Sequence, residues 1–323
     1  MSTRLKALVV LGAGAMLITA CSSNGGNAAP SGSGSGPANQ KIKVTLLTKA
    51  TGGFWDAMIA GAKQYQTDHP NDIELTTNAC KTNDDTPCQI AQIQDAVTKK
   101  AQAIVISPMG VGVTDALNEA QQAGVRIVFV DNTIPGVVPD AVAATNNVKG
   151  GEAAGAYIKT QLKSGDTIGL LEAVRGVPNL DQRIDGVKAA LEGTGVKVVT
   201  GAQQTLCDTK TGASVTQDLL TKYPNLTAIY SACDSPAMGA VAVVESKQHP
   251  LQIFGYDGDP EMAKLIAAGK TTATMAQSPF KMTNLGVEAA IKSLKGQNYV
   301  KSIDTGTTLV TKDNAADFTS AWQ

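Results

Sequence analysis

Residues 103–108 read AIVISP, and residues 125–132 read VRIVFVDN. Each stretch is an almost unbroken apolar run that ends in a polar or turn-forming residue. Short runs rich in Val and Ile are typical of strands buried on both faces. The segment between them, 113–123, has the apolar spacing of a helix. Together they predict a β-α-β unit, in which the two strands lie parallel in one sheet.

The same alternation continues in both directions along the chain. Further strands are predicted at 42–47, 73–77, 167–171, 196–199, 228–230, 252–255, 272–275 and 307–310. Further helices are predicted at 55–65, 90–98, 151–162, 180–191, 214–222, 237–247, 261–268 and 283–294. This pattern predicts an α/β fold of doubly wound parallel sheets with helices on both faces.

The N-terminus has the features of a secretory signal. Arg4 and Lys6 precede an apolar stretch, 7–18, and a small residue precedes Cys21. The apolar stretch falls short of the ~20 residues that span a bilayer. The cysteine after the small residue resembles the bacterial lipobox, which implies a signal peptide at 1–20 and lipid on Cys21. Residues 21–40, rich in Ser, Gly, Asn and Pro, then form a flexible tether of roughly 25 Å. The expected location is extracytoplasmic, on the cell membrane.

Composition narrows the possible partners of the remaining segment, 41–323. Its length suits two domains of ordinary size. The whole chain has 27 basic and 28 acidic residues and shows no basic cluster, so nucleic acid is not an expected partner. No later segment is long and apolar enough to be expected to cross a membrane.

If Cys21 carries lipid, four cysteines remain, an even number that suits disulfides in an oxidising compartment. Three pairings are possible, and proximity in the sequence favours Cys80–Cys88 and Cys207–Cys233. No pair of cysteines has C-x-x-C spacing, and His69 and His249 each precede a proline in a predicted loop. We therefore expect no metal site.

Polar residues follow several of the apolar strands. They are Asp131 and Asn132 after Val130, Cys233 and Asp234 after 228–230, Asp257 after 252–255, and Gln277 after 272–275. Ligands of open parallel sheets bind at the carboxyl ends of strands, so these side chains are candidates for one binding site. Each aspartate could instead cap a helix, and Asp234, which begins Asp-Ser-Pro-Ala-Met before a helix, most of all.

Several short segments resemble a known family, the periplasmic sugar-binding proteins of the ribose, galactose and xylose type. The resemblance covers about 41–309. The segments that carry it are Gly53-Phe54-Trp55, Val130-Asp131-Asn132, 145–151 (TNNVKGG), 183–187 (RIDGV), Gly255-Tyr256-Asp257-Gly258 and 276–279 (AQSP). Each segment is short, but all occur in order and at matching spacings.

The resemblance implies a type I periplasmic binding fold with two lobes and three hinge crossovers, near Thr145, Gln277 and Ser302. The N-terminal lobe would comprise 41–145 and 277–302, and the C-terminal lobe 146–276 and 303–323.

The resemblance also implies roles for individual side chains. Two aromatic residues would pack on the ligand, two residues of the first lobe would grip neighbouring hydroxyls, and the others would be polar contacts. The expected ligand-binding residues are Phe54, Trp55, Asp131, Asn132, Asn179, Arg183, Asp257 and Gln277. Since Phe54 and Trp55 are adjacent on a helix, both cannot face one core, and we expect one in the cleft.

The chain departs from the ribose-binding pattern at four positions. Gly52 and Asn132 stand where ribose binders carry Asn and Arg, Cys207 takes the aromatic position of the second lobe, and Cys233 takes an amide position. Both cysteines map to one pocket wall, which supports their pairing and suggests that a disulfide replaces a stacking ring. A flexible or acyclic polyol is therefore an alternative to a cyclic pentose or hexose.

The resulting functional prediction is a solute-binding lipoprotein of an ABC importer. It would be a monomer that binds a sugar or sugar alcohol, closes by hinge motion and docks on a membrane permease, without a cofactor. A receptor that feeds a sensor or quorum system is an alternative. An enzyme using Asp131 and Asp257 as an acid–base pair is another, but the chain lacks G-x-S-x-G and dinucleotide motifs. A transcription factor of the same fold would need a DNA-binding segment where this chain has a secretion signal.

Overall fold

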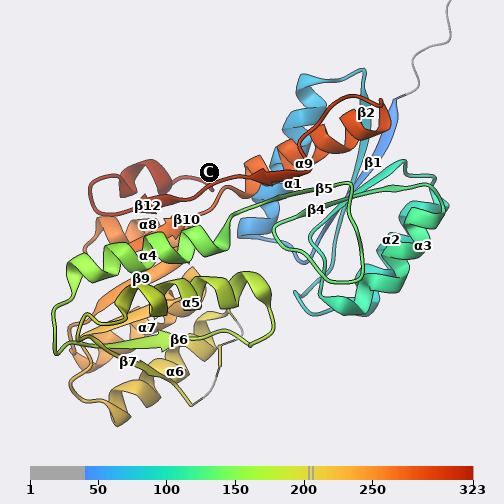
Figure 1. Ribbon diagram of the computed structural model, residues 1–323. Coiled ribbons are helices and arrows are strands. Elements are labelled where there is room, and N and C mark those ends of the chain that lie inside the picture. The colour runs from blue at the N-terminus through green and yellow to red at the C-terminus, as the bar shows by residue number, and fades with distance from the viewer. Residues whose placement is uncertain (1–40, 203, 206, 323) are drawn as a thin grey trace, which may run out of the picture. The chain divides into compact units, whose positions relative to one another are not determined.

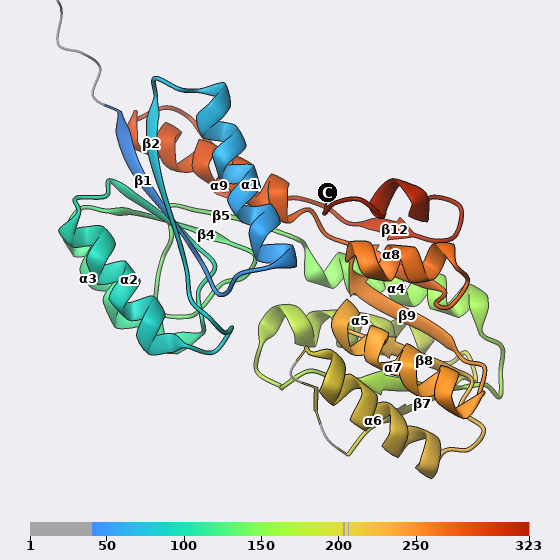
Figure 2. The same ribbon diagram turned by 180° about the vertical axis from the view of Figure 1, so that it is seen from behind.

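The computed structural model describes residues 41–202, 204–205 and 207–322. The predicted signal peptide, the tether and Cys21 lie outside these residues. Strands and helices alternate through two lobes, each built on a single six-stranded sheet (Figures 1 and 2). The predicted class, an α/β fold of two parallel-sheet lobes, is confirmed.

The first lobe contains the sheet β11-β5-β4-β3-β1-β2. Its elements are β1 (Ile42–Thr48), α1 (Gly53–Asp68), β2 (Ile73–Ala79), α2 (Thr86–Thr98), β3 (Ala103–Ile106), η1 (Val111–Val113), α3 (Thr114–Gln122), β4 (Arg126–Val130), β5 (Ala141–Ala144), α9 (Pro279–Leu294) and β11 (Ser302–Asp304). All five strand pairings are parallel.

The second lobe contains the sheet β12-β10-β9-β8-β6-β7. Its elements are α4 (Asn147–Gln161), β6 (Thr167–Leu171), α5 (Pro178–Leu191), β7 (Lys197–Thr200), α6 (Thr209–Lys222), β8 (Ala228–Ser231), α7 (Asp234–Lys247), β9 (Gln252–Asp257), α8 (Pro260–Ala267), β10 (Ala273–Ala276), β12 (Thr308–Val310) and η2 (Ala315–Phe318). Only β12 runs antiparallel to its neighbour, β10.

The chain passes from one sheet to the other at three places: between β5 and α4, between β10 and α9, and between β11 and β12. The first two include Thr145 and Gln277. The third differs from the expectation, because Ile303 and Asp304 pair with Ala143 and Ala144 of the first sheet. The crossover thus begins after Asp304, and the assignment of residues 303 and 304 to the C-terminal lobe was wrong.

Each sheet divides its apolar side chains between two cores. In β4, Val128 and Val130 point to the core under α1 and α9, while Ile127 and Phe129 point to the core under α2 and α3. The second sheet does the same between α4 and α5 on one face and α6, α7 and α8 on the other. This two-sided burial explains why the strands read as continuous apolar runs.

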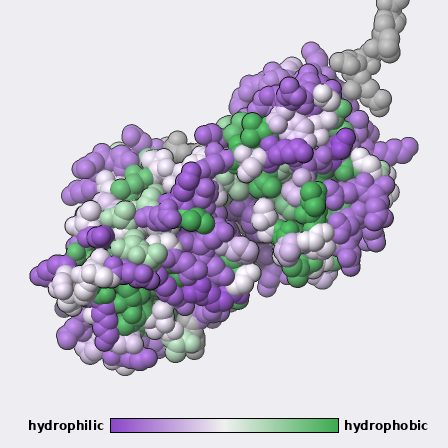
Figure 3. All heavy atoms as spheres, viewed as in Figure 1, coloured by the Kyte–Doolittle hydropathy of each residue, from purple (hydrophilic) through white to green (hydrophobic). Residues whose placement is uncertain are grey.

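The face shown in Figure 3 is largely hydrophilic, with small separate apolar patches. None of the described helices combines the length and apolar character that a membrane span needs.

Several helices begin earlier than their apolar spacing predicts, because side-chain caps extend them. Asp85 accepts a hydrogen bond from the backbone of Cys88, Asn146 from Lys149, and Asp208 from Thr211. Each bond satisfies an N–H group that the first turn of a helix leaves unpaired. Capping therefore fixes the helix starts next to the strand ends, where the polar residues gather.

Glycines let α4 and α5 pack in direct backbone contact. A Cβ added to Gly186 would lie 2.5 Å from the carbonyl carbon of Gly151, and one added to Gly151 would lie 2.7 Å from the Gln182 carbonyl oxygen. Neither position can hold a side chain without moving a helix. This contact sets the position of α5, the helix that carries Arg183.

Gly186→Ala should separate α4 from α5. Helix propensity favours alanine by roughly 0.5–1 kcal/mol, but overpacking of this kind destabilises by about 1–3 kcal/mol. We therefore expect a net loss in the free energy of unfolding, measured by urea denaturation. Ala189→Ser, which also adds one heavy atom but on the exposed face of α5, is the control. Equal stability of the two variants would contradict this account of the packing.

Candidate ligand-binding site

The candidate site is built at the carboxyl ends of strands in both sheets. In the first lobe, Lys49, Ser107 and Asp131 follow β1, β3 and β4 directly. In the second lobe, Ala232 follows β8 and Asp257 ends β9. The parallel arrangement brings the ends of neighbouring strands to the same sheet edge, as expected.

Asp131 is held in place by two neighbouring strand ends. Its Oδ2 accepts a hydrogen bond from Ser107 Oγ at 2.8 Å. The same oxygen forms an ion pair with Lys49 Nζ at 3.2 Å. Its φ of 70° is rare for a residue with a side chain. Such backbone strain persists only where the surroundings impose it, and it is common in binding sites. Both of these bonds use Oδ2, and with no bond from another described residue Oδ1 is available to a ligand.

Asn132 lines the pocket described below and is also bonded within the first lobe. Its Oδ1 accepts a hydrogen bond from Ser107 and its Nδ2 donates to the Pro108 carbonyl, so both polar atoms are engaged within the first lobe. This geometry makes Asn132 a support for the strand ends that hold Asp131.

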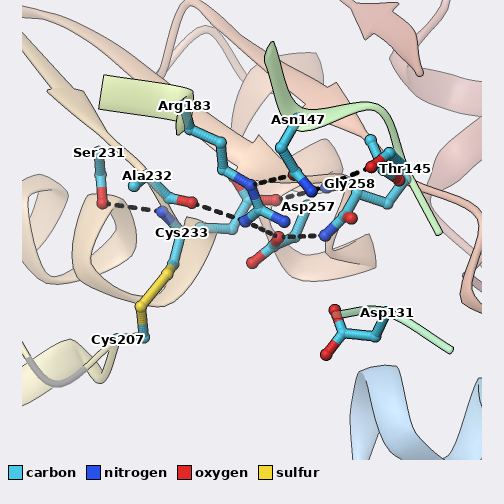
Figure 4. Close-up of polar contacts among 12 residues, drawn as sticks. Asp131, Thr145, Asn147, Arg183, Cys207, Ser231, Ala232, Cys233, Asp257 and Gly258 are labelled. Atoms are coloured by element: carbon cyan, nitrogen blue, oxygen red, sulfur yellow. Dashed lines mark hydrogen bonds and ion pairs between the residues drawn. A yellow bond between two sulfur atoms is a disulfide. The ribbon is translucent and has the colours of Figure 1, made fainter. Parts of the chain in front are cut away.

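In the second lobe, the polar contacts converge on the buried guanidinium of Arg183 (Figure 4). Its Nε donates to Asn147 Oδ1 at 2.8 Å, and its Nη1 donates to the Ala232 carbonyl and to Asp257 Oδ1, each at 2.9 Å. The guanidinium also lies 4.0 Å from the ring centroid of Tyr256. These partners compensate for placing a charge where only 2% of the side chain is exposed.

Asp257 balances that charge and connects it to a crossover. Its Oδ1 also accepts a hydrogen bond from Gln277 Nε2 at 2.7 Å, while the Gln277 backbone N–H donates to the Asp257 carbonyl. Asp257, like Asp131, has a positive φ, here 131°. Gln277 Oε1 is buried and makes no hydrogen bond within the described residues. It is therefore an acceptor that a ligand or a water molecule can use.

The charges of these groups influence one another. Burial opposes the charge of Arg183, but Asp257, Tyr256 and Asp131 outweigh it and raise the pKa of Arg183. Burial raises the pKa of Asp257 to about 6, against the lowering effects of Arg183 and Gln277. Since 20% of the Asp257 side chain is exposed, we expect solvent to limit that rise, so the carboxyl is ionised at neutral pH.

Asp234 supports the loop that carries Asp257. Its Oδ2 accepts hydrogen bonds from the backbone N–H groups of Gly258 and Asp259, and its Oδ1 accepts one from Thr274. Burial and the charge of Asp257 raise the pKa of Asp234 to about 8, while its hydrogen bonds favour the ionised form. Asp234 is the first residue of α7 and not its N-cap, so its structural role is to anchor a loop.

A pocket of about 250 Å³ lies beside the first crossover, and Arg183, Asp257 and Gln277 are not among the residues that line it. Asp131 lines it from the first lobe, and Asn147 and Asn179 line it from the second. Asn179 Oδ1 is buried and makes no hydrogen bond to any described residue. A polar ligand in this pocket could satisfy that atom.

The two predicted aromatic residues lie at the start of α1. Phe54 and Trp55 are both partly buried against the first-lobe core, so the expectation that they cannot both face one core was wrong. They contact each other edge to face, with ring centroids 5.1 Å apart. Lys49 Nζ lies 5.6 Å from the Trp55 ring centroid, which places Trp55 beside Asp131's ion-pair partner. Phe54 contacts Trp322 instead, at 5.5 Å.

Two disulfides join Cys80 to Cys88 and Cys207 to Cys233, the pairing favoured from the sequence. Cys233 immediately follows Ala232, whose carbonyl accepts a hydrogen bond from Arg183 (Figure 4). The second disulfide thus braces the turn on which the guanidinium rests.

Comparison with known proteins identifies the family. Residues 42–298 match the model of a periplasmic binding protein domain. The chain is 30% identical to a D-ribose/D-allose-binding protein of Pseudomonas aeruginosa, over 88% of this chain and 90% of that one. An ABC transporter solute-binding protein from Burkholderia multivorans, with an unknown ligand built as α-D-erythrofuranose, superposes with a TM-score of 0.77 at 31% identity, covering 84% of this chain and all (100%) of that one. One from Mycobacterium smegmatis with bound glycerol gives 0.78 at 27% identity, covering 86% and 96%.

The chain belongs to the periplasmic binding protein domain family. The family resemblance predicted from the sequence is therefore confirmed. The relatives named above are solute-binding proteins and not enzymes, which confirms that part of the prediction.

Several residues of this periplasmic binding protein's site were not predicted. Lys49 and Asn147 contact Asp131 and Arg183 across sequence separations of 82 and 36 residues, so the sequence does not show which partners they meet. The signal for Lys49 was its place two residues after the predicted strand 42–47, the place that Asp257 and Gln277 take after their strands. Asn147 lies within the family segment at 145–151, where a stricter residue-by-residue comparison could have suggested it.

Removing the Cys207–Cys233 disulfide should loosen the turn at Ala232. For Cys207→Ser with Cys233→Ser, we expect the free energy of unfolding to fall by roughly 3.5 kcal/mol, the loop-closure value for this separation. Hydrogen exchange at 231–233 should accelerate, because those amides lose their tether.

The matched control is Cys80→Ser with Cys88→Ser, which should cost roughly 2.5 kcal/mol and leave exchange at 231–233 unchanged. Unaltered exchange in the Cys207/Cys233 variant would show that this disulfide does not support the Arg183 contact.

Proposed function

We propose that this protein is the extracytoplasmic solute-binding component of an ABC importer and that its ligand is a monosaccharide or a sugar alcohol. The observation that carries the proposal is the buried Arg183–Asp257–Gln277 cluster, with Asp131 close enough for its charge to raise the pKa of both Arg183 and Asp257. These four side chains supply hydrogen-bond donors and acceptors at the strand ends of both lobes.

The charges of the site favour an uncharged ligand. Lys49 pairs with Asp131 in the first lobe, and Arg183 pairs with Asp257 in the second. Each cation is therefore neutralised by its own carboxylate, and neither pair needs an ionic ligand group. What remains is capacity for hydrogen bonds, at Asp131 Oδ1, Gln277 Oε1 and Asn179 Oδ1.

Hydroxyl groups match this capacity, since each can donate one hydrogen bond and accept others. A carboxylate can bind two neighbouring hydroxyls, and charge-assisted bonds of this kind are stronger than neutral ones. The C–H face of a sugar can pack on an aromatic ring such as Trp55. An analogue that lacks one hydroxyl would leave a buried polar atom unpaired, at roughly 1–3 kcal/mol, and this gives selectivity.

Known relatives support a ligand in this class without fixing its size. One binds ribose or allose by its name, and one was solved with glycerol. The disulfide at Cys207 supports the flexible or acyclic alternative, because it stands where the resemblance implies a stacking ring. A cyclic pentose or hexose is the competing choice, and a ligand screen separates them.

The proposed mechanism is hinge closure about the three crossovers. A ligand that contacts Asp131 in one lobe and the Arg183 group in the other binds the closed form more tightly and shifts the population towards it. Gln277 lies in a crossover and bonds Asp257 through both side chain and backbone, so it would connect ligand contact to the hinge. The closed form would then dock on a membrane permease. A receptor that feeds a sensor differs only in the partner that reads this closure.

A thermal-shift screen against pentoses, hexoses and alditols tests the function. A ligand at 100 times its dissociation constant should add about 2.7 kcal/mol of stability. Asp131→Ala should abolish the shift, because it removes the acceptor of the first lobe. Asp131→Asn tolerates the positive φ and keeps one acceptor oxygen but loses the charge, so it should weaken the shift.

Asp115→Ala, an exposed aspartate on α3, is the matched control and should keep the full shift. Absence of any shift across the whole panel would reject the polyhydroxyl ligand.

We further propose that lipid on Cys21 holds the protein at the membrane, on the strength of the signal-like stretch that precedes it. Cys21→Ala, expressed in a bacterium, should move the protein from the membrane pellet to the soluble fraction. Ser22→Ala should stay in the pellet. Release of both variants, or of neither, would argue against this anchor.

A further inference from the structure

The start of α1 lacks a side-chain cap. Gly52 and Gly53 have φ values of 87° and 45°, and Gly52, the N-cap, has no side chain to accept a hydrogen bond from the first turn. Two local hydrogen bonds hold this turn: the Gly52 backbone N–H donates to Asp56 Oδ1 at 3.1 Å, and the Trp55 backbone N–H donates to the Gly52 carbonyl at 3.0 Å. Glycines lose more conformational freedom on folding than other residues, so contacts from outside this turn add to its order.

The same helix start carries one wall of the proposed site. Trp55 lies next to Lys49, and Lys49 forms the ion pair with Asp131. A shift of the first turn of α1 would therefore move Trp55 and remove a contact from Lys49. The position of this turn therefore matters to the proposed ligand contacts.

An outside contact comes from the C-terminal tail, which belongs to the second lobe. After β12, Ala315 and Phe318 of η2 are buried in the core that includes Met262 and Ile266 of α8 (Figure 1). Four residues later, Trp322 reaches the first lobe. Its ring meets Phe54 edge to face at 5.5 Å and lies 3.6–3.9 Å from where a Cβ of Gly53 would stand.

The rings form a continuous chain from the second lobe to the site. Trp322 contacts Phe54 at an interplanar angle of 86°, and Phe54 contacts Trp55 at 83°. Edge-to-face pairs at these distances are attractive beyond the area that they bury. Phe54 is the middle ring of this series.

We propose that Trp322 is a positioning residue for ligand binding: the second lobe, through its C-terminal tail, holds the start of α1 and thereby sets Trp55 and Lys49. This inference rests on the proposed function. The tail is a non-covalent link between the lobes in addition to the three crossovers. Four extended residues span at most about 14 Å, so the contact persists only while the start of α1 stays within that reach of Phe318.

The chain offers a direct test, because Trp55 and Trp322 are its only 2 tryptophans. Both Trp322→Ala and Trp322→Phe leave Trp55 as the single tryptophan, whose emission can be excited selectively over that of the 6 tyrosines, and only the second keeps an aromatic edge against Phe54. In ligand-free protein, acrylamide should quench Trp55 more strongly in the Ala variant than in the Phe variant. Far-UV circular dichroism and thermal unfolding confirm that both variants are folded.

The second readout is the affinity for whichever sugar or alditol the thermal-shift screen identifies. We expect it to fall by up to about tenfold in the Ala variant and to be largely restored in the Phe variant, a range set by one aromatic pair. Phe54→Leu should reduce affinity similarly, and its effect should not add to that of Trp322→Ala, since both break one contact.

Equal quenching of Trp55 in the Ala and Phe variants would overturn the proposal. So would stronger quenching with unchanged affinity, because the tail would then order α1 without positioning the ligand wall. If no sugar binds to the wild-type protein, the proposed function fails, whereas the quenching comparison still decides whether Trp322 holds the helix start.

Discussion

The site depends on one requirement: the guanidinium of Arg183, almost completely removed from water, must keep its partners. A buried charge is tolerated only when it is paired and hydrogen-bonded. Asn147 at the start of α4, the Ala232 carbonyl after β8 and Asp257 at the end of β9 meet that requirement together. These bonds fix α4, β8 and β9 relative to α5. The glycine contact between α4 and α5 lets these two helices come close enough for the bond to Asn147.

The carboxylates of the site are held by backbone geometry as well as by hydrogen bonds. Asp131 and Asp257 each leave a strand with a positive φ, a conformation that residues with a Cβ seldom adopt. Asp131 is stabilised by Ser107 and Lys49, and the loop of Asp257 is stabilised by Asp234. Ser107 and Asp234 are themselves polar and buried, and Lys49 is partly buried, so the protein's own contacts hold the carboxylates in place.

The strands that the sequence reveals are those with apolar runs buried on both faces. β5 and β11 escape prediction because they are three or four residues long, lie towards one edge of the sheet and contain Ala, Ser and Asp. Missing β11 also misplaced the third crossover. In the site, the strand-end rule finds Asp131, Asp257 and Gln277, because their position follows from a local pattern. The same rule, applied to the predicted strand 42–47, would also have found Lys49. It cannot find Asn147 or Trp322, whose contacts depend on how distant segments pack, and it cannot show that Asn132 is engaged within its own lobe.

Each lobe pairs its cation with its own carboxylate, and this affects how ligand binding responds to the ionic strength of the solution. Because Lys49 and Arg183 each face their own carboxylate, the site projects little net field into the solvent, and long-range steering of a ligand contributes little to the encounter. The interactions that remain act at contact distance, where mobile ions screen them least. A protein built in this way can keep its affinity nearly constant as the ionic strength outside the cell changes.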